Sequence, residues 1–483
     1  MSKPMASLLL HISRHKPLAA CVIAAFALST PSAWAATTWT VDTCGDAGVS
    51  TGLTSGDLRY AINHAFSGDT IDMIGLPALQ CSRISLLTGA LVANQATLTL
   101  NGPGVDKLDI DAAIVNSRVI NHQGTGTLYI NGVALSSGTY SSSSAARGGC
   151  LYSKGSVALS HASVYSCTAR TTAGVAVAQG GGIFTQQKLT LNASSVHDNS
   201  ADASSGGSAA GGGAYTAATV GNQFLAQDST IAHNHVTAAN TVNSNGGGLR
   251  LRTGGVISNS TISGNTSNGD AGGISVNTGG PTPPSFSLLS STVSGNSAAH
   301  FASGVLANNV ATVVTNSTIA FNTTSNTSTI PPSAGLVINQ FSGNPLPLTL
   351  QSNIIANNTT ASTSSPENDF GFVSYLGPFS NSSTNNLIGG VYSGVPLPAG
   401  TISGVCPRLG PLRFNGGPTS THALLSGSRG IDEGANGLNF ADDQRGPGYP
   451  RISGSVADIG AYEVQQADMV FDNGFDGCPA LPP

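Results

Sequence analysis

A short phrase of polar residues around one aliphatic residue returns along the chain and usually closes on asparagine, as in SNSTISGN (residues 258–265). Its aliphatic position is occupied in turn by Leu135, Val164, Val196, Ile231, Ile262, Val293, Ile319 and Ile355. These positions are 29, 32, 35, 31, 31, 26 and 36 residues apart. Self-similarity at such a period indicates a solenoid with one repeat per turn and a loop of variable length.

Glycines followed by a short alternation of apolar and polar residues form a second repeated element, as in GGGIFTQ (180–186) and GGGLRLR (246–252). The alternation predicts a short strand. Its inward positions are Leu151, Ile183, Ala214, Leu249, Ile274, Val305 and Leu336. Short strands at this period without helical periodicity predict an all-β parallel β-helix, a solenoid of the pectate-lyase type. The crossover rule for parallel strands predicts that it is right-handed.

The closing asparagines fall in one register, and we expect them to stack from turn to turn. They are Asn199, Asn234, Asn265, Asn296, Asn322 and Asn358. Stacked asparagine amides stabilise in-register parallel strands by hydrogen bonds along the stack. Glycosylation sequons at Asn259, Asn316 and Asn322 are the competing explanation. Because the register extends beyond the sequons, the sequence favours a structural asparagine ladder.

Residues 1–35 have the features of a signal peptide: early positive charges, an apolar run over 18–28, and Ala-Trp-Ala at 33–35. A lipoprotein box ending at Cys21 is the alternative, but charged residues stand where its apolar run belongs. No other apolar stretch approaches membrane length. We therefore expect a protein exported through a cleaved signal peptide to the extracellular space or the outer-membrane surface.

Six cysteines follow the signal peptide: Cys44, Cys81, Cys150, Cys167, Cys406 and Cys478. An even number of cysteines in an exported chain indicates disulfides. Their order favours the local pairs 44–81, 150–167 and 406–478 among fifteen possible connectivities. No cysteine or histidine spacing is typical of zinc, so we expect no metal and no other cofactor.

The two ends of the solenoid have a different character from its repeats. The expected organisation is the signal peptide (1–35), an N-terminal cap and first turns (36–115), β-helix repeats (116–365), the last turns with an irregular C-terminal region (366–463), and a tail (464–483). Asp57 is placed to cap a short helix that runs to about His64. Such caps are needed because a solenoid otherwise exposes strand edges.

A family resemblance rests on motifs at both ends: LRYAI (58–62) with GDTID (68–72), NGGPTSTHALLSGSRGIDEG (415–434), and DQRGPGYPR with DIGAYE (443–463). With these motifs the chain resembles bacterial secreted β-helix proteins that carry a choice-of-anchor Q type C-terminal region. The GGGI and VHDN elements are similar to the repeats of polymorphic outer-membrane proteins. The resemblance implies export and a surface or extracellular setting. Tyr60 departs from the family pattern, which has an acid there. Because only 20 residues follow Glu463, we expect no translocating barrel on this chain.

Composition narrows the possible partners. The chain has 61 Gly, is 8% charged and 40% hydrophobic, and has a net charge of −5. The aliphatic residues suffice for a packed core, whereas the charge and the lack of a basic stripe argue against nucleic acid.

Acid–base chemistry has few candidate residues. The acids between positions 120 and 366 are Asp198, Asp202, Asp228 and Asp270, without any Glu. Asp198, Asp202, His233 and His235 are the best catalytic or metal candidates. We prefer the interpretation that they are polar residues near a turn, since they meet few tests of an active site.

Outward positions beside the glycine-rich strands give a stronger signal. Tyr152, Phe184 and Tyr215 fall on successive turns, about 5 Å apart. Lys154, Arg250 and Arg252 flank them. An aromatic and basic stripe of this kind is suited to an acidic glycan, because Arg binds carboxylates. The alternative is that the aromatic rings only stabilise the sheet or lie under a loop such as 200–210.

The sequence thus predicts a non-catalytic, adhesin-like surface protein that binds glycans or other surfaces. A carbohydrate-active enzyme, either a polysaccharide lyase or a glycoside hydrolase, is the alternative on the same fold. A structural envelope protein without a specific ligand is the second alternative.

Overall fold

The structure is a computed structural model that describes residues 35–465, apart from 219–220, 222, 278–284, 326–333, 341–345, 362–368, 374–378 and 392–394. The predicted signal peptide up to Trp34, Cys478 and the tail beyond Gln465 lie outside the described residues.

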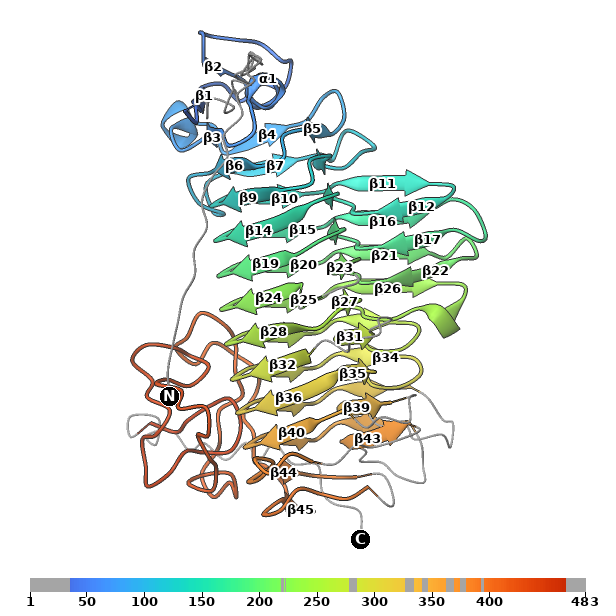
Figure 1. Cartoon of the computed structure of the whole chain (residues 1–483), viewed down its shortest axis with the longest axis vertical. Helices are drawn as coiled ribbons and strands as arrows, with labels where there is room; N and C mark the ends of the chain where they lie inside the picture. Colours follow the sequence, from blue (N-terminus) through green and yellow to red (C-terminus); the bar gives the residue numbers. More distant parts are fainter. Residues whose placement is uncertain are drawn as a thin grey trace, which may run out of the picture. The chain divides into compact units, whose positions relative to one another are not determined.

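Three parallel sheets form the walls of a right-handed β-helix (Figure 1). Sheet 1 contains β2 (Ser55–Gly56), β1 (Thr38–Val41), β3 (Thr70–Asp72), β6 (Leu98–Asn101), β9 (Thr127–Asn131), β14 (Ser156–Ser160), β19 (Leu189–Asn192), β24 (Phe224–Gln227), β28 (Gly255–Ser258), β32 (Ser285–Leu289), β36 (Ala311–Thr315) and β40 (Leu348–Gln351). Sheet 2 contains β4 (Arg83–Ser85), β7 (Asp109–Asp111), β10 (Ala134–Ser136), β15 (Ser163–Tyr165), β20 (Ser195–His197), β25 (Thr230–Ala232), β29 (Thr261–Ser263), β33 (Thr292–Ser294), β37 (Thr318–Ala320), β41 (Ile354–Ala356), β44 (Leu387–Ile388) and β45 (Ile402–Ser403). Sheet 3 contains β5 (Leu91–Ala93), β8 (Ile120–His122), β13 (Leu151–Ser153), β18 (Ile183–Thr185), β23 (Ala214–Thr216), β27 (Leu249–Leu251), β31 (Ile274–Asn277), β35 (Val305–Asn308), β39 (Leu336–Asn339) and β43 (Phe370–Val373).

The repeated aliphatic residue of each turn points into the core. The positions predicted from Leu135 to Ile355 pair in register on neighbouring strands of sheet 2. All of them are fully buried. Complete burial of one such side chain contributes about 1.5–3 kcal/mol, so this column and its counterparts in the other sheets hold the turns together. The fold class expected from the sequence is confirmed.

The closing asparagines form a continuous ladder inside the β-helix. Each amide donates to the side-chain oxygen of the next one, over 2.8–2.9 Å, from Asn199 to Asn358. The last amide, of Asn358, donates to Asp369 Oδ1 at 2.7 Å. Asn316 and Asn322, which carry two of the three sequons, are fully buried. Their burial favours a structural role over glycosylation, because a glycan needs an exposed acceptor.

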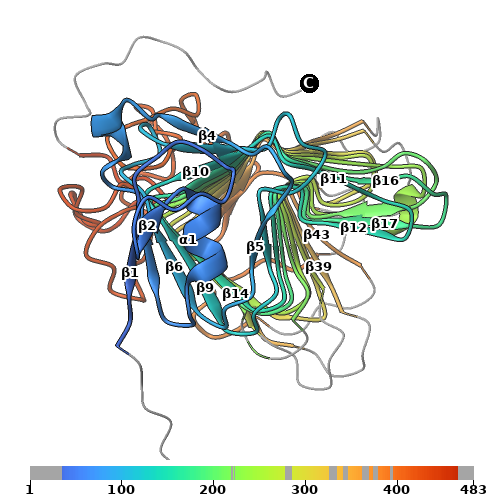
Figure 2. The same ribbon diagram turned by 90° about the horizontal axis from the view of Figure 1, so that it is seen from above.

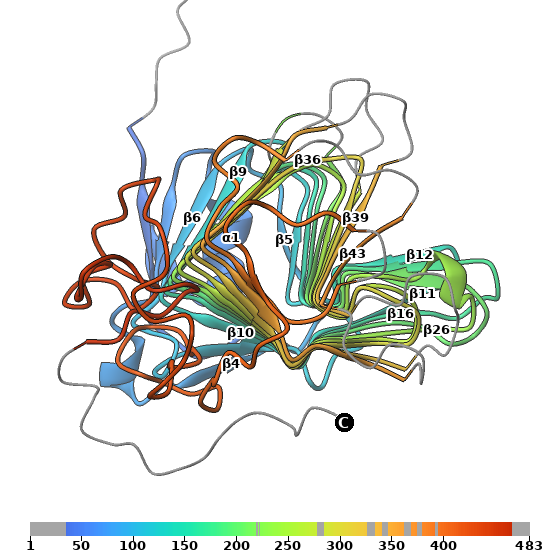
Figure 3. The same cartoon turned by 90° about the horizontal axis from the view of Figure 1, so that it is seen from below.

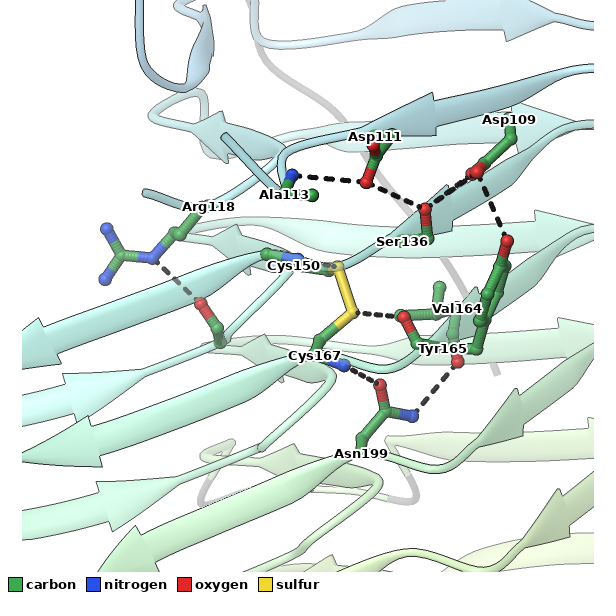
Figure 4. Close-up of a disulfide and its surroundings, with 12 residues drawn as sticks. Asp109, Asp111, Ala113, Arg118, Ser136, Cys150, Val164, Tyr165, Cys167 and Asn199 are labelled. Atoms are coloured by element: carbon green, nitrogen blue, oxygen red, sulfur yellow. Dashed lines mark hydrogen bonds between the residues drawn. A yellow bond between two sulfur atoms is a disulfide. The ribbon is translucent and has the colours of Figure 1, made fainter. Parts of the chain in front are cut away.

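Two of the expected disulfides are present, Cys44–Cys81 and Cys150–Cys167. Cys406 is also disulfide-bonded, and its expected partner Cys478 lies outside the described residues. Cys167 stands one turn before Asn199, and its backbone N–H donates to Asn199 Oδ1 at 3.1 Å (Figure 4). The Cys150–Cys167 disulfide therefore continues the column that the asparagine ladder occupies on later turns.

Removal of this disulfide should measurably destabilise the protein. It closes a segment with a sequence separation of 17, for which loop closure stabilises by about 3 kcal/mol. We expect the Cys150→Ala/Cys167→Ala variant to lose about that much of the free energy of unfolding in chemical denaturation. Peptide mapping of the unreduced wild-type protein is the control, and a free thiol at either position would contradict the pairing.

The N-terminal end is closed by helix α1 (Leu58–His64), which lies across the end of the sheets in Figure 2. Asp57 caps it, as the sequence predicts: Asp57 Oδ1 accepts from the backbone N–H of Tyr60 at 2.8 Å. Leu58, Ala61 and Ile62 bury the inner face of the helix. A 3-10 helix, η1 (Leu76–Leu79), follows in the same region.

The irregular C-terminal region that the sequence predicts is present, and it lies along the outer face of sheet 2 (Figure 3). Gln444 Oε1 accepts from Thr292 Oγ1 at 2.6 Å, and Thr261 Oγ1 donates to the carbonyl of Ser420 at 2.6 Å. Farther along, the N–H of Ala461 donates to Thr318 Oγ1 at 3.1 Å. A column of buried threonine hydroxyls thus fastens this region across successive turns.

Two smaller parallel sheets project from the β-helix beside sheet 3, and we call them the wing (Figure 2). The larger contains β11 (Thr139–Ser142), β16 (Thr168–Thr171), β21 (Ser200–Ala203), β26 (His235–Ala238), β30 (Thr266–Ser267), β34 (Ser297–Ala298), β38 (Thr323–Thr324) and β42 (Thr359–Thr360). The smaller contains β12 (Ala145–Arg147), β17 (Val177–Gln179) and β22 (Ser208–Ala210), and the 3-10 helix η2 (Thr241–Asn243) follows on the next turn. The wing has a small core of its own, made of Ala178, Ala201, Ala203, Ala209, Val236 and Ala238.

Candidate functional site

Glycines make the sharp corner at which the chain leaves the wing and enters sheet 3. Gly211 has a φ of +65°, a conformation that glycine adopts without steric cost. A Cβ on Gly212 would collide with the carbonyl oxygen of Gly247 on the next turn. The corner therefore brings the small wing sheet close to the outer face of sheet 3, and a groove lies between them.

Aromatic rings from sheet 3 line the inner wall of this groove. Tyr152 and Phe184 stack with centroids 5.6 Å apart, and Phe184 and Tyr215 with centroids 5.4 Å apart. The strand register sets this spacing, because the three residues are direct partners on β13, β18 and β23. Gln186 Nε2 donates to the hydroxyl of Tyr152 at 2.9 Å and fixes the outermost ring.

Arg118 stands at one end of the aromatic stack. Its guanidinium lies 3.3 Å from the ring centroid of Tyr140 and 5.1 Å from that of Tyr152. Its Nε donates to the carbonyls of Arg147 and Gly148, at 2.9 and 3.0 Å. Burial lowers the pKa of Arg118 from its usual value, yet an arginine stays protonated in proteins. Arg118 is therefore a fixed positive charge held between two aromatic faces.

Arg147 and Arg252 add two more positive charges along the same groove. Arg147 Nε donates to Gln179 Oε1 at 2.9 Å, and its guanidinium lies 5.2 Å from the centroid of Phe184. Arg252 is exposed and follows β27, three turns farther along sheet 3 than Tyr152. No ion pair joins Arg118, Arg147 or Arg252 to a carboxylate of the described part of the chain.

The groove consists of two cavities that share Arg147. One, of about 290 Å³, is lined by Arg118, Asn121, Gln123, Tyr140, Ala145, Arg147 and Tyr152. The other, of about 280 Å³, is lined by Arg147, Gln179, Phe184, Gln186, Tyr215, Ala217 and Arg252. Neither has a carboxylate in its described lining. Positive charge, amide groups and aromatic faces therefore converge in one open groove.

The predicted stripe is thus only partly a surface. Phe184 and Tyr215 are 2% and 5% exposed, which corrects the expectation that all three rings are open to solvent. The wing covers them, as the alternative of an overlying loop anticipated. Tyr152 is half-buried, Arg252 and Lys154 are exposed, and Lys154 does not line either cavity.

Sequence reasoning missed Arg118, Tyr140 and Arg147. Each comes from a different element outside the repeat columns: the segment before β8, β11 and β12. The sequence does contain a signal for Arg147. This arginine directly precedes the paired glycines at 148–149, which form the corner beside the aromatic column.

An acid, Asp270, lies beside Asn245 on the next turn and within electrostatic range of Arg250. Asp270 Oδ1 lies 3.2 Å from His300 Nδ1, and burial raises the pKa of Asp270 to about 6. The attraction of His300 opposes that rise. Asp270 and His300 were not among the sequence candidates. Asp270 is one of four acids between positions 120 and 366, and it shares no repeat column with the other three.

The sequence candidates for acid–base chemistry occupy two separate places. Asp198 and His233 are corner residues of sheet 2, with φ of 55° and 53°, directly before ladder asparagines. His197 Nδ1 lies 2.7 Å from Asp198 Oδ2. Asp202 is held elsewhere, by Arg170 on the neighbouring wing strand at 2.8 Å. His235 lies within electrostatic range of Asp198 and His233, and burial lowers its pKa. Aspartate and histidine tolerate the left-handed conformation. This requirement of the corner explains why Asp198 and His233 stand at these positions.

A separate pair of acids, Asp109 and Asp111, lies on the outer face of sheet 2. Asp109 and Asp111 both receive a hydrogen bond from Ser136 Oγ, at 2.8 and 3.4 Å (Figure 4). Tyr165 donates to Asp109 Oδ2 at 3.2 Å, and Arg83 lies 3.4 Å from the same carboxylate. Burial raises the pKa of Asp109.

Among residues 35–465 that the structure describes, no three or more His, Cys, Asp or Glu side chains are grouped to hold a metal ion. No helix in the described ranges is long and apolar enough to cross a membrane.

Comparisons with known proteins give a similarity of fold. No family model and no curated protein matches the chain. Among solved structures, the chain is similar to pectate lyase Pel9A, at 13% sequence identity and a TM-score of 0.42, over 89% of this chain and 97% of that chain. The assignment of this protein as a parallel β-helix rests on its strand pairing.

Proposed function

We propose that the protein is an exported, non-catalytic surface protein whose groove binds an acidic polysaccharide. The observation that carries the proposal is the set of three arginines, Arg118, Arg147 and Arg252, which face one groove without a carboxylate partner among the described residues. A protein of net charge −5 that concentrates unpaired positive charge in this way has a local preference for anions.

The chemistry of the groove matches that of an acidic sugar chain. A guanidinium binds a carboxylate or a sulfate through two parallel hydrogen bonds. The amides of Asn121, Gln123 and Gln186 are suited to sugar hydroxyls, because an amide both donates and accepts. Of the three stacked rings, Tyr152 is the one that is only half-buried. The positions of Arg147 and Arg252 on the repeat differ by three turns, about 14 Å at the strand spacing of a sheet, so a short oligosaccharide contacts both.

The disulfides and the features of residues 1–35 support export, since disulfides persist in oxidising compartments. The resemblance of residues 415–463 to choice-of-anchor Q regions supports placement at the cell surface. Within this proposal, residues 36–115 and 366–463 are the terminal regions around the repeats of 116–365.

Loss of the groove arginines should abolish the preference for acidic chains. We expect wild-type protein to bind alginate more tightly than neutral dextran, and the Arg147→Gln/Arg252→Gln variant to bind alginate at least about tenfold more weakly, since one charged hydrogen bond contributes about 1.5–3 kcal/mol. Affinity should fall as salt is added. Isothermal titration calorimetry measures both effects.

Arg170→Gln is the matched control, because Arg170 lies on the wing and is already paired with Asp202. It should leave the alginate affinity unchanged. Equal affinity of wild type for alginate and dextran, or equal losses in the groove and control variants, would contradict the proposal. Absence of binding to any polysaccharide would favour a structural envelope protein.

A carbohydrate-active enzyme is the second candidate, and it has one observation in its favour. Asp109 and Asp111 adjoin Tyr165 on the outer face of sheet 2, and the pKa of Asp109 is raised by burial, as general acids require. Release of new reducing ends from a polysaccharide, lost in Asp109→Asn, would establish this candidate over the non-catalytic one.

A further inference from the structure

A small pocket opens beyond Tyr215, at the far end of the groove. It has a volume of about 90 Å³, and its lining includes Gln179, Tyr215, Asn245 and Arg250. It shares Gln179 and Tyr215 with the middle cavity of the groove. Its volume is about a third of that of either neighbouring cavity, so the pocket suits a small substituent better than a sugar ring.

Arg250 provides this pocket with a positive charge whose close partners among the described residues are the neutral hydroxyls of Ser275 and Tyr215. Its Nη1 donates to Ser275 Oγ at 2.5 Å. No carboxylate among the described residues lies within ion-pair distance of the Arg250 guanidinium. Asp270 attracts it from a longer distance and forms its own ion pair with His300. A guanidinium that is largely removed from water favours an anion at its remaining donors.

Asn245 gives the pocket an acceptor. Its Oδ1 is buried and has no hydrogen-bond partner in the described structure. Buried polar atoms are nearly always paired, so an unpaired one at a pocket wall points to a ligand group or a water molecule that completes it. Here the missing partner is a donor, such as a hydroxyl.

We propose that the Arg250 pocket binds one negatively charged substituent of the polysaccharide, a carboxylate or a sulfate, while an adjacent hydroxyl donates to Asn245. This inference rests on the proposed function, and it identifies the part of the groove that distinguishes an acidic sugar from its neutral derivative. Arg118, Arg147 and Arg252 lie in the open cavities and attract the chain as a whole. Arg250 selects the charged group at one position.

Measurements at high salt distinguish the general attraction by the open arginines from the selection of one charged group by Arg250. At about 1 M salt the Debye length falls to about 3 Å, which screens the open arginines far more than an enclosed one. The probes are alginate, its propylene glycol ester, dextran sulfate and dextran. We expect wild type to retain at least a fivefold preference for alginate over the ester at high salt, or the same preference for dextran sulfate over dextran if the pocket takes a sulfate.

Arg250→Gln should remove this high-salt preference, whereas Arg147→Gln should lower the affinities and keep their ratio. Arg250→Lys, which retains the charge without the planar fork, should retain part of the preference and guards against a variant that fails to fold. Thermal unfolding is measured on each variant. A wild-type preference that survives in folded Arg250→Gln overturns the pocket assignment while the groove proposal stands. Failure of wild type to prefer acidic chains even at low salt overturns the proposed function itself.

Discussion

Replacing Asn265 by alanine should cost about 4 kcal/mol of the free energy of unfolding, because it interrupts the ladder at its centre. Asn265 Nδ2 donates to Asn296 Oδ1 at 2.9 Å and to the carbonyl of Ile231 at 3.0 Å. Asn265 Oδ1 accepts from the side-chain and backbone N–H groups of Asn234, at 2.9 and 3.0 Å. Alanine leaves the Ile231 carbonyl and the Asn234 backbone N–H without this partner inside the protein, at about 1–3 kcal/mol for each unsatisfied group.

Asn116→Ala is the matched control, since Asn116 is exposed before β8. A surface change of this kind should alter stability by less than about 0.5 kcal/mol. Denaturant unfolding followed by circular dichroism measures both variants. If Asn265→Ala is as stable as Asn116→Ala, the ladder does not stabilise the fold as described.

Replacing Arg445 by methionine should release the C-terminal region from sheet 2. Arg445 and Asp443 are fully buried and form an ion pair, with Nη2 2.8 Å from Oδ2. The guanidinium also lies 4.0 Å from the centroid of Tyr449 and 3.8 Å from that of Tyr462. Loss of one partner of a buried ion pair costs about 3–5 kcal/mol, because the other charge remains uncompensated.

Hydrogen exchange over residues 409–463 measures this release, and Arg413→Met, which removes an exposed arginine of the same region, is the control. Burial raises the pKa of Asp443, and Arg445 opposes that rise. Without Arg445 the folded-state pKa rises further above the unfolded one. The variant should therefore lose more stability at neutral than at acidic pH. Exchange rates equal to those of Arg413→Met would contradict the clamp.

The core of the β-helix was predictable because its signal is periodic. Ile231, Ile262 and Val293 return at the same place in each repeat, and their register follows from that spacing alone. The helix cap was predictable for a different reason: Asp57 is a local signal that needs no knowledge of the fold.

The wing and the position of the C-terminal region were not predictable, because their contacts use small residues. The wing core consists largely of alanines such as Ala201 and Ala209, which resemble loop composition in a chain rich in glycine and serine. Thr261 and Thr292 receive the C-terminal region, yet a threonine on the outer face of a strand looks the same whether it is covered or exposed.

In the candidate site, too, the residues on repeat columns were predictable and the residues outside them were not. Tyr152 and Arg252 were identified because they occupy repeat columns, and the repeat fixes which side of the sheet they face. Phe184 and Tyr215 occupy that column as well, but the wing buries them. Arg147 reaches the groove because the wing strand β12 lies beside sheet 3, an arrangement that no single repeat contains.

A crystal structure of the protein with an acidic oligosaccharide, such as an alginate tetramer, tests the central claim most directly. The account predicts that the sugar chain lies in the groove between sheet 3 and the wing, over Tyr152, with charged groups at Arg147 and Arg252. A chain bound on sheet 2 beside Asp109 and Tyr165, or an empty groove at saturating oligosaccharide, would contradict it.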